Sequence, residues 1–315
     1  MKKFHKVAFL FPGQGAQYVG MGKDFFHNYA IARETYQEAE DLLKHNLTKI
    51  IFEGPESELT KTLNSQLGIY VTSIALLRVL KQAFPEIQPA FCAGLSLGEY
   101  SALTASGRLE FSAALHLVQH RAQFMNEACE AYPGTMAVVM GLEGSEVEEM
   151  VASLKLPQDL WAANFNCPGQ VVISGTSKGI EIGTEAAKSR GAKRVLPLQV
   201  YGAFHSGLMQ SAQDRLAEYI MRAPFKDGAC RLVMNVPGDF TGDLGQIIQY
   251  LIKQVTHPVR WEQSVRQLQG AGTDLYVEIG CGKTLSGLNK RIGVVAPTLN
   301  IEKVEDLAAF EQVWR

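Results

Sequence analysis

Short apolar runs alternate along the chain with stretches that repeat at the helical period. Val7–Phe11 is apolar at every position and ends at Pro12, so it predicts a buried strand. Helical periodicity follows at 24–43, 67–84 and 111–129. Strands that are apolar on both faces and alternate with helices are typical of a parallel sheet covered on both sides. The pattern therefore predicts an α/β fold.

The pattern changes after Tyr132-Pro133-Gly134, where the elements become short and closely spaced. We expect a strand at 136–140, a helix at 144–154, hairpin strands at 161–165 and 171–174, a helix at 178–190 and a strand at 194–200. This βαββαβ order is typical of a ferredoxin-like unit. We therefore expect a large α/β-hydrolase-like domain formed by residues 1–130 and 199–315, with a small ferredoxin-like domain inserted at 131–198. Ser112 and Ser145 are the expected N-caps of the helices at 111–129 and 144–154.

Composition limits the class of protein. The chain has 315 residues, 46% of them hydrophobic and 20% charged, as in ordinary globular proteins. A net charge of -2 offers no basic footprint for nucleic acid. Five scattered cysteines suggest no disulfide framework and favour a reducing, cytoplasmic setting. No apolar run approaches the length of a bilayer span, so we expect no membrane association.

Gly94-Leu95-Ser96-Leu97-Gly98 is the strongest chemical signal in the sequence. It follows the apolar run 89–93 and precedes the helix-forming stretch 99–103. A G-x-S-x-G string between a strand and a helix is a nucleophile elbow, whose tight turn exposes the serine hydroxyl. Glycine and serine are also ordinary turn residues, so the string by itself could be a structural turn. In this context we predict that Ser96 is a nucleophile in acyl transfer.

His205 is the histidine best placed to activate Ser96. A serine hydroxyl needs a base within hydrogen-bond reach, and His205 follows a predicted strand, where α/β sheets hold their ligands. A packed or helix-capping histidine is the alternative. No aspartate partner is evident, so a backbone carbonyl or an amide side chain could orient the imidazole. The oxyanion needs two N–H donors, one from Leu97 and a second from the loop Gly13-Gln14-Gly15.

Arg121 lies on a helix that otherwise presents apolar side chains to the core. An arginine near such a stripe usually extends to solvent. It could instead hold a carboxylate with two parallel hydrogen bonds, and the residues leave both readings open. The loop at 13–15 lacks the third glycine of a dinucleotide site, and no metal-ligand spacing occurs. We therefore expect no permanently bound cofactor and no metal.

Seven blocks of the sequence resemble the malonyl-CoA:acyl carrier protein transacylases of bacterial and organellar type, a family related to free-standing polyketide acyltransferases. The blocks occur in order over nearly the whole chain. They are 11–15 (FPGQG), 94–103 (GLSLGEYSAL), the helix of Arg121, 164–175 (NFNCPGQVVISG), 202–206 (GAFHS), 254–261 (QVTHPVRW) and 278–283 (EIGCGK).

This resemblance implies a ping-pong transfer of malonyl from malonyl-CoA to the phosphopantetheine thiol of acyl carrier protein, which supplies extender units for fatty acid biosynthesis. It implies Ser96 as the acylated nucleophile and His205 as its base. The backbone carbonyl of Gln254 would orient His205, and the N–H groups of Gln14 and Leu97 would form the oxyanion hole.

The resemblance also implies the substrate contacts. Arg121 would bind the malonyl carboxylate, which favours the second of its two readings. Asn164 and Asn166 would lie on the small-domain side of the cleft. Phe204 would crowd the α-methyl group of methylmalonyl and so favour malonyl, although one bulky side chain discriminates only modestly.

Two positions depart from the commonest family pattern, since Leu95 and Cys281 replace a frequent histidine and a frequent proline. Leu95 keeps open a free-standing malonyl transferase of a polyketide pathway. An acyl-thioester hydrolase on the same scaffold is a further alternative, against which Arg121 argues. We expect a cytoplasmic monomer whose partner is acyl carrier protein.

Overall fold

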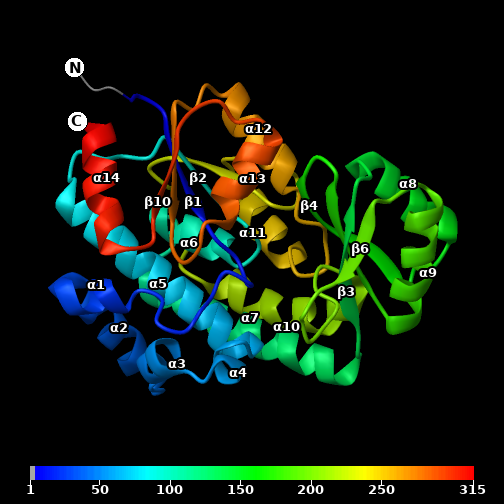
Figure 1. The fold of residues 1–315 in the computed structure, drawn as a ribbon. Coiled ribbons are helices and arrows are strands. Elements are labelled where there is room, and N and C mark those ends of the chain that lie inside the picture. Colours follow the sequence, from blue (N-terminus) through cyan, green and yellow to red (C-terminus); the bar gives the residue numbers. More distant parts are fainter. Residues whose placement is uncertain (1–3) are drawn as a thin grey trace.

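The computed structural model describes residues 4–315, which form two β-sheets (Figure 1). Sheet A has the strand order β10-β9-β1-β2-β7-β8, and sheet B has the order β4-β5-β3-β6. The strands of sheet A are β1 (Val7–Phe11), β2 (Phe91–Gly94), β7 (Arg231–Met234), β8 (Asp239–Thr241), β9 (Leu275–Ile279) and β10 (Thr298–Ile301). Those of sheet B are β3 (Thr135–Met140), β4 (Leu160–Cys167), β5 (Gln170–Gly175) and β6 (Arg194–Pro197).

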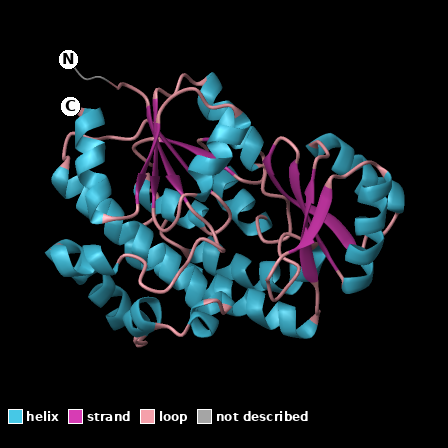
Figure 2. Cartoon of the chain, viewed as in Figure 1, coloured by secondary structure: helices cyan, strands magenta, loops and turns pink. Residues whose placement is uncertain are grey.

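Sheet A is parallel except for β8, which pairs antiparallel with β7. Sheet B is antiparallel throughout and lies apart from sheet A (Figure 2). The predicted fold class, a mostly parallel α/β sheet with a separate antiparallel βαββαβ unit, is confirmed. The domain boundaries 1–130, 131–198 and 199–315 remain a prediction.

Strand β1 explains why sheet A is covered on both faces. Its side chains alternate between two hydrophobic clusters, Val7, Phe9 and Phe11 in one and Ala8 and Leu10 in the other. The first cluster includes α5 (Thr62–Ala83) and α7 (Phe111–Ala131), and the second includes α12 (Trp261–Gly270) and α13 (Thr284–Ile292). The sheet is therefore a central layer between helices, as its doubly apolar strands predict.

The remaining helices complete these layers. On sheet B, α8 (Gly144–Leu154) and α9 (Ser177–Ser189) pack on one face and bury a third, smaller cluster. The other helices are α1 (Lys23–Asn28), α2 (Ala30–Leu43), α3 (Leu47–Glu53), α4 (Glu56–Leu59), α6 (Gly98–Ala105), a 3₁₀ helix (Gly207–Met209), α10 (Gln210–Arg222), α11 (Leu244–Lys253) and α14 (Val304–Trp314).

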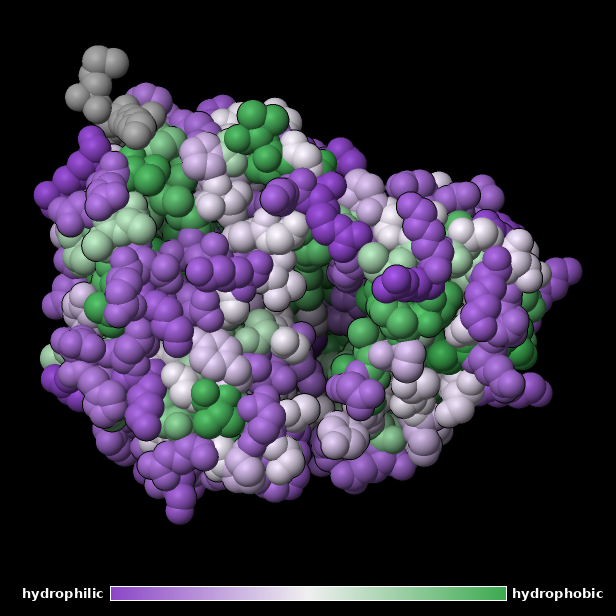
Figure 3. Space-filling view, viewed as in Figure 1, coloured by the Kyte–Doolittle hydropathy of each residue, from purple (hydrophilic) through white to green (hydrophobic). Residues whose placement is uncertain are grey.

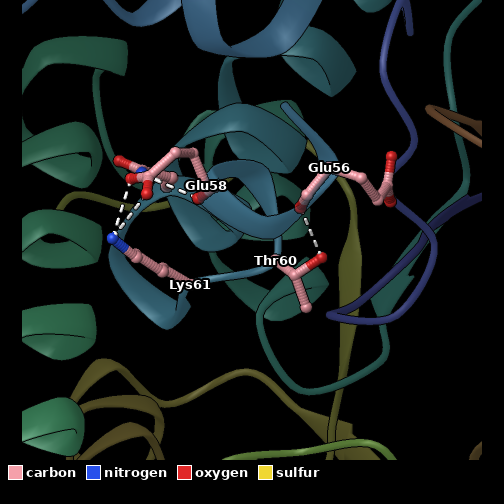
Figure 4. A network of polar contacts seen from close by, with 5 residues as sticks. Glu56, Glu58, Thr60 and Lys61 are labelled. Carbon is pink, nitrogen blue, oxygen red and sulfur yellow. Dashed lines mark hydrogen bonds and ion pairs between the residues drawn. The ribbon is translucent and has the colours of Figure 1, made fainter. Parts of the chain in front are cut away.

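Helix α5 begins at a compact polar turn and then runs through the core. Lys61 Nζ donates to both carboxylate oxygens of Glu58 at 2.7 and 2.8 Å, and Thr60 Oγ1 donates to the carbonyl of Glu56 at 2.8 Å (Figure 4). The helix is long and apolar enough to cross a membrane, but 89% of its apolar window is buried inside the protein. The expectation that no apolar run approaches a bilayer span is therefore wrong for α5, whose burial is that of a core helix.

The expected N-caps are also wrong by two residues. Glu110 precedes α7 and Glu143 precedes α8, so Ser112 and Ser145 lie inside the first turn of each helix. At α8 the N–H of Glu143 donates to Glu146 at 2.7 Å, which forms a capping box without the serine.

Candidate active site

Strand β2 enters a turn so tight that glycine is required at two positions. A Cβ on Gly94 would lie 2.0 Å from the backbone of Gly98, and a Cβ on Gly98 would lie 2.1 Å from the carbonyl oxygen of Phe11. Between them Ser96 adopts a left-handed backbone with φ of 51°. Its N–H donates to Oδ1 of Asn235 at 2.7 Å. The turn thus has the strained geometry of a nucleophile elbow.

Ser96 and His205 form a hydrogen-bonded pair. Ser96 Oγ lies 2.8 Å from Nε2 of His205, whose Nδ1 lies 2.7 Å from the carbonyl oxygen of Gln254 and 3.2 Å from that of His257. A carbonyl can only accept, so the proton is on Nδ1, and Nε2 is free to accept the serine proton. Burial and the charge of Arg121 lower the pKa of His205 to about 4, against the two carbonyls. His205 is therefore neutral at pH 7, as a base must be.

Arg121 is buried beside Ser96 and does not extend to solvent, since only 1% of it is exposed. Its Nη1 donates to Oε1 of Gln66 at 2.6 Å, and its Nη2 donates to Ser96 Oγ at 3.0 Å and to Oε1 of Gln254 at 3.1 Å. Burial lowers the pKa of the guanidinium. Within residues 4–315 it forms no salt bridge, and its Nε has no acceptor. A buried cation without a carboxylate partner fits an anionic substrate.

The loop that follows β1 packs directly on the elbow. A Cβ on Gly13 would lie 2.4 Å from the carbonyl oxygen of Leu95, so the two turns are in backbone contact. In the described part of the chain, the backbone N–H groups of Gln14 and Leu97 donate to no protein acceptor. Two such donors, one on this loop and one directly after Ser96, are what an oxyanion hole needs.

A buried polar group that the sequence pattern did not indicate lies beneath the elbow. Oε1 of Glu99 accepts from the N–H of Asn235 at 2.6 Å, and its Oε2 accepts from Nε2 of Gln254 at 2.7 Å. Nε2 of Gln254 also donates to the carbonyl of Ser96 at 2.8 Å, and Nδ2 of Asn235 donates to that of Gly94 at 2.7 Å. Burial raises the pKa of Glu99 to about 8, opposed by its two hydrogen bonds and by Arg121. The signal in the sequence that could have indicated this group is that Glu99 is the one charged residue of α6, which the structure buries from Gly98 to Leu103.

Asn164 and Asn166 lie on β4 of sheet B. Figure 3 shows a hollow between the larger part of the molecule and the part that contains sheet B. Asn164 is 9% exposed and pairs with Val259 in an isolated bridge. The segment 254–259 therefore contacts both sheet B and His205. Among residues 4–315, no hydrogen bond joins the side chain of Asn164 or Asn166 to the other candidate site residues.

Leu95 and Phe204 directly precede Ser96 and His205 in the sequence, and Cys281 lies further along the chain. Phe204 is 6% exposed and belongs to the larger hydrophobic cluster. Leu95 packs against the second cluster. Cys281, like the other four cysteines, is buried and forms no disulfide.

In the part of the chain that the structure describes, no group of three or more His, Cys, Asp or Glu side chains could hold a metal ion.

Known proteins resemble this chain over nearly its whole length. The chain matches the family model of the acyl transferase domain over residues 8–285. It is 42% identical over 303 residues to the malonyl CoA-acyl carrier protein transacylase of Bacillus subtilis (strain 168), covering 96% of this chain and 95% of that protein. It is similar to the solved structure of an acyl carrier protein S-malonyltransferase from Vibrio cholerae, with a TM-score of 0.93 and 37% identity over 97% of this chain and 100% of that one. A malonyl-transacylase solved with its type II polyketide synthase acyl carrier protein gives a TM-score of 0.91 and 35% identity, over 97% of this chain and 98% of that one.

Proposed function

The chain belongs to the acyl transferase domain family, and we propose that Ser96 and His205 carry out its transfer of malonyl from malonyl-CoA to acyl carrier protein. The transfer supplies extender units for fatty acid biosynthesis.

The first half-reaction acylates Ser96. His205 Nε2, 2.8 Å from Oγ, takes the hydroxyl proton while Oγ forms a bond to the thioester carbonyl carbon of malonyl-CoA. The carbonyl oxygen becomes an oxyanion, which the N–H groups of Gln14 and Leu97 stabilise. The carbon–sulfur bond then breaks, and the leaving CoA sulfur takes the proton from His205. The product is a malonyl ester of Ser96.

The second half-reaction runs the same steps with a different thiol. The phosphopantetheine thiol of the carrier protein gives its proton to His205, and its sulfur attacks the malonyl ester. Ser96 Oγ leaves and recovers the proton from His205. Gln254 keeps Nδ1 protonated through its backbone carbonyl in both halves, so the lone pair stays on Nε2.

The single observation that carries the substrate assignment is the buried Arg121 beside Ser96 Oγ. A guanidinium can hold both oxygens of the malonyl carboxylate, which a neutral acyl chain does not offer. Asn164 and Asn166 would contact the substrate from the side of sheet B, and Phe204 would disfavour an α-methyl group.

We expect a cytoplasmic monomer without a membrane partner. The net charge of -2 offers no basic footprint for nucleic acid. The similarity to a malonyl-transacylase that was solved with a polyketide carrier protein keeps a polyketide pathway as the alternative. Transfer rates to carrier proteins of both kinds would separate the two pathways.

The test is to replace Arg121 by Ala and to measure the second-order rate of Ser96 acylation with malonyl-CoA and with acetyl-CoA. We expect a loss of about a hundredfold or more with malonyl-CoA, because a buried carboxylate left without its partner costs several kcal/mol. Acetyl-CoA should be affected little. Arg108→Ala is the matched control, since Arg108 is also buried, at 5% exposed, but donates to the carbonyl of Cys230 instead. Equal losses with both substrates in Arg121→Ala would contradict the assignment.

A further inference from the structure

The side chain of Gln254 lies between a cation and a carboxylate, all three fully buried. Its Oε1 accepts from Nη2 of Arg121 at 3.1 Å, and its Nε2 donates to Oε2 of Glu99 at 2.7 Å. The exposed fractions are 0% for Gln254 and Glu99 and 1% for Arg121. Nε2 makes a second hydrogen bond, to the carbonyl of Ser96 at 2.8 Å. These contacts are therefore shielded from bulk solvent.

The two neighbours fix which way the amide faces. A guanidinium has donors only, and an ionised carboxylate has acceptors only. A reversed amide would place its NH₂ group against the donors of Arg121 and its oxygen against Glu99 and the carbonyl of Ser96. Each buried polar group left unpaired in this way would be costly. The network thus admits one orientation of Gln254.

Glu99 is itself held in place. Its other oxygen accepts from the backbone N–H of Asn235 at 2.6 Å, so each carboxylate oxygen has its own donor, Asn235 or Gln254. Both oxygens face N–H donors, and a carboxylic proton would have no acceptor among these partners. These hydrogen bonds and the charge of Arg121 favour the ionised form, against the burial that raises the pKa of Glu99 to about 8.

We propose that Glu99 is a positioning residue for substrate selection: it orients the Gln254 amide, and the amide in turn holds Arg121 beside Ser96. This rests on the proposed role of Arg121 as the group that binds the malonyl carboxylate. Glu99 touches neither the substrate nor the reacting atoms in this scheme. Glu99 fixes the position of Arg121, which is the residue proposed to bind the malonyl carboxylate.

Glu99→Gln keeps the size of the side chain and replaces one acceptor by a donor. If its oxygen remains on the N–H of Asn235, its NH₂ faces the NH₂ of Gln254. That conflict is relieved only when Gln254 turns over, which breaks its bond to Ser96 and places its NH₂ against Arg121. The guanidinium then loses an acceptor and its fixed position.

The experiment compares second-order rates of Ser96 acylation by malonyl-CoA and by acetyl-CoA, from adduct mass, in the full chain. We expect Glu99→Gln to lower the malonyl-to-acetyl rate ratio at least about tenfold. Glu278→Gln is the matched control, because Glu278 is also fully buried and accepts from the backbone N–H groups of Leu285 and Ser286. Both variants should lose thermal stability, but the control should keep the wild-type ratio. An unchanged ratio in Glu99→Gln would overturn the proposal, since a merely structural carboxylate would lower both rates together.

A double-mutant cycle tests the route through Gln254. Gln254→Met removes the amide but keeps the backbone carbonyl that orients His205, and it should lower the rate ratio to a similar degree. In that background Glu99→Gln should change the ratio less than about twofold. A further loss in the double variant as large as that of Glu99→Gln alone would overturn the route through Gln254. A wild-type ratio in Gln254→Met would also overturn it. This single variant tests the route even if Glu99→Gln does not fold. Arg121→Ala distinguishes failure of the proposed function from failure of this inference. If Arg121→Ala keeps the wild-type malonyl-to-acetyl ratio, the carboxylate-binding role of Arg121 is wrong. If the ratio falls in Arg121→Ala but not in Glu99→Gln, only the positioning role of Glu99 is refuted.

Discussion

Gly98→Ala perturbs the nucleophile elbow without removing any reacting group. The added Cβ would lie 2.1 Å from the carbonyl oxygen of Phe11 and 2.8 Å from that of Pro12. Both contacts are with backbone, and the Phe11 oxygen already accepts from the N–H of Leu95 at 3.0 Å, so no side chain can rotate to relieve the clash. The end of β1 and the elbow must therefore move apart.

The size of that movement sets the expected loss of activity. Raising a 2.1 Å contact above the 3.0 Å that real Cβ atoms respect needs a shift of roughly 1 Å. The shift separates the loop of Gln14 from Leu97, the two residues proposed to stabilise the oxyanion. A misplacement of about 1 Å at a catalytic group costs about a hundredfold in rate, so we expect kcat/KM for malonyl transfer to fall by about that factor.

The assay is steady-state transfer to carrier protein, together with acylation by malonyl-CoA and acetyl-CoA. Both substrates should lose rate equally in Gly98→Ala, because the elbow and the proposed oxyanion donors would serve every acyl group. Gly287→Ala in α13 is the control, since nothing lies within 4 Å of its added Cβ, and it should retain activity and stability. Circular dichroism verifies that Gly98→Ala is folded. Activity within about threefold of wild type in the folded variant would refute this reasoning.

Two further predictions follow from the pKa of His205, lowered by burial and by Arg121 to about 4 from an ordinary 6.5. Acylation of Ser96 per folded molecule should stay level from pH 7 to pH 5 and fall only as the pH passes through about 4; a fall centred near 6.5 in a pH–rate profile would contradict it. Stability should behave differently, because between these pKa values the unfolded chain binds a proton that the folded chain does not. The free energy of unfolding should therefore decrease as the pH is lowered through this window. This group alone should account for a loss of about 2 kcal/mol between pH 7 and pH 5. Urea denaturation of wild type and His205→Asn at both pH values checks this, and an equal pH dependence of the two would show that the histidine is not responsible.

Sequence reasoning succeeded where the signal is local. The fold class follows from strands such as Val7–Phe11, whose side chains are buried on both faces, and from the spacing of the βαββαβ unit. The G-x-S-x-G string predicts a tight turn around Ser96, and the structure shows that side chains at Gly94 and Gly98 would clash with the backbone. The Ser96 hydroxyl contacts His205, which was predicted to follow a strand.

The positions that were missed depend on contacts across the fold. Glu99 contacts Asn235 and Gln254, which lie 136 and 155 residues away in the chain, and Gln66 contacts Arg121 across 55 residues. A single sequence gives no pairing information at such distances, so these polar residues looked like ordinary members of their helices and loops. The orienting carbonyl of Gln254 came from the family resemblance for the same reason, since a backbone group has no sequence signature.

The central claim is that malonyl passes through an ester of Ser96. Mass spectrometry of the peptide that contains Ser96, after incubation with malonyl-CoA and then with phosphopantetheinylated carrier protein, tests it most directly. We expect one malonyl group on Ser96, its complete absence in Ser96→Ala, and its loss from wild type as the malonyl carrier protein forms. An adduct that persists in Ser96→Ala, or malonyl transfer at the wild-type rate by that variant, would contradict the account.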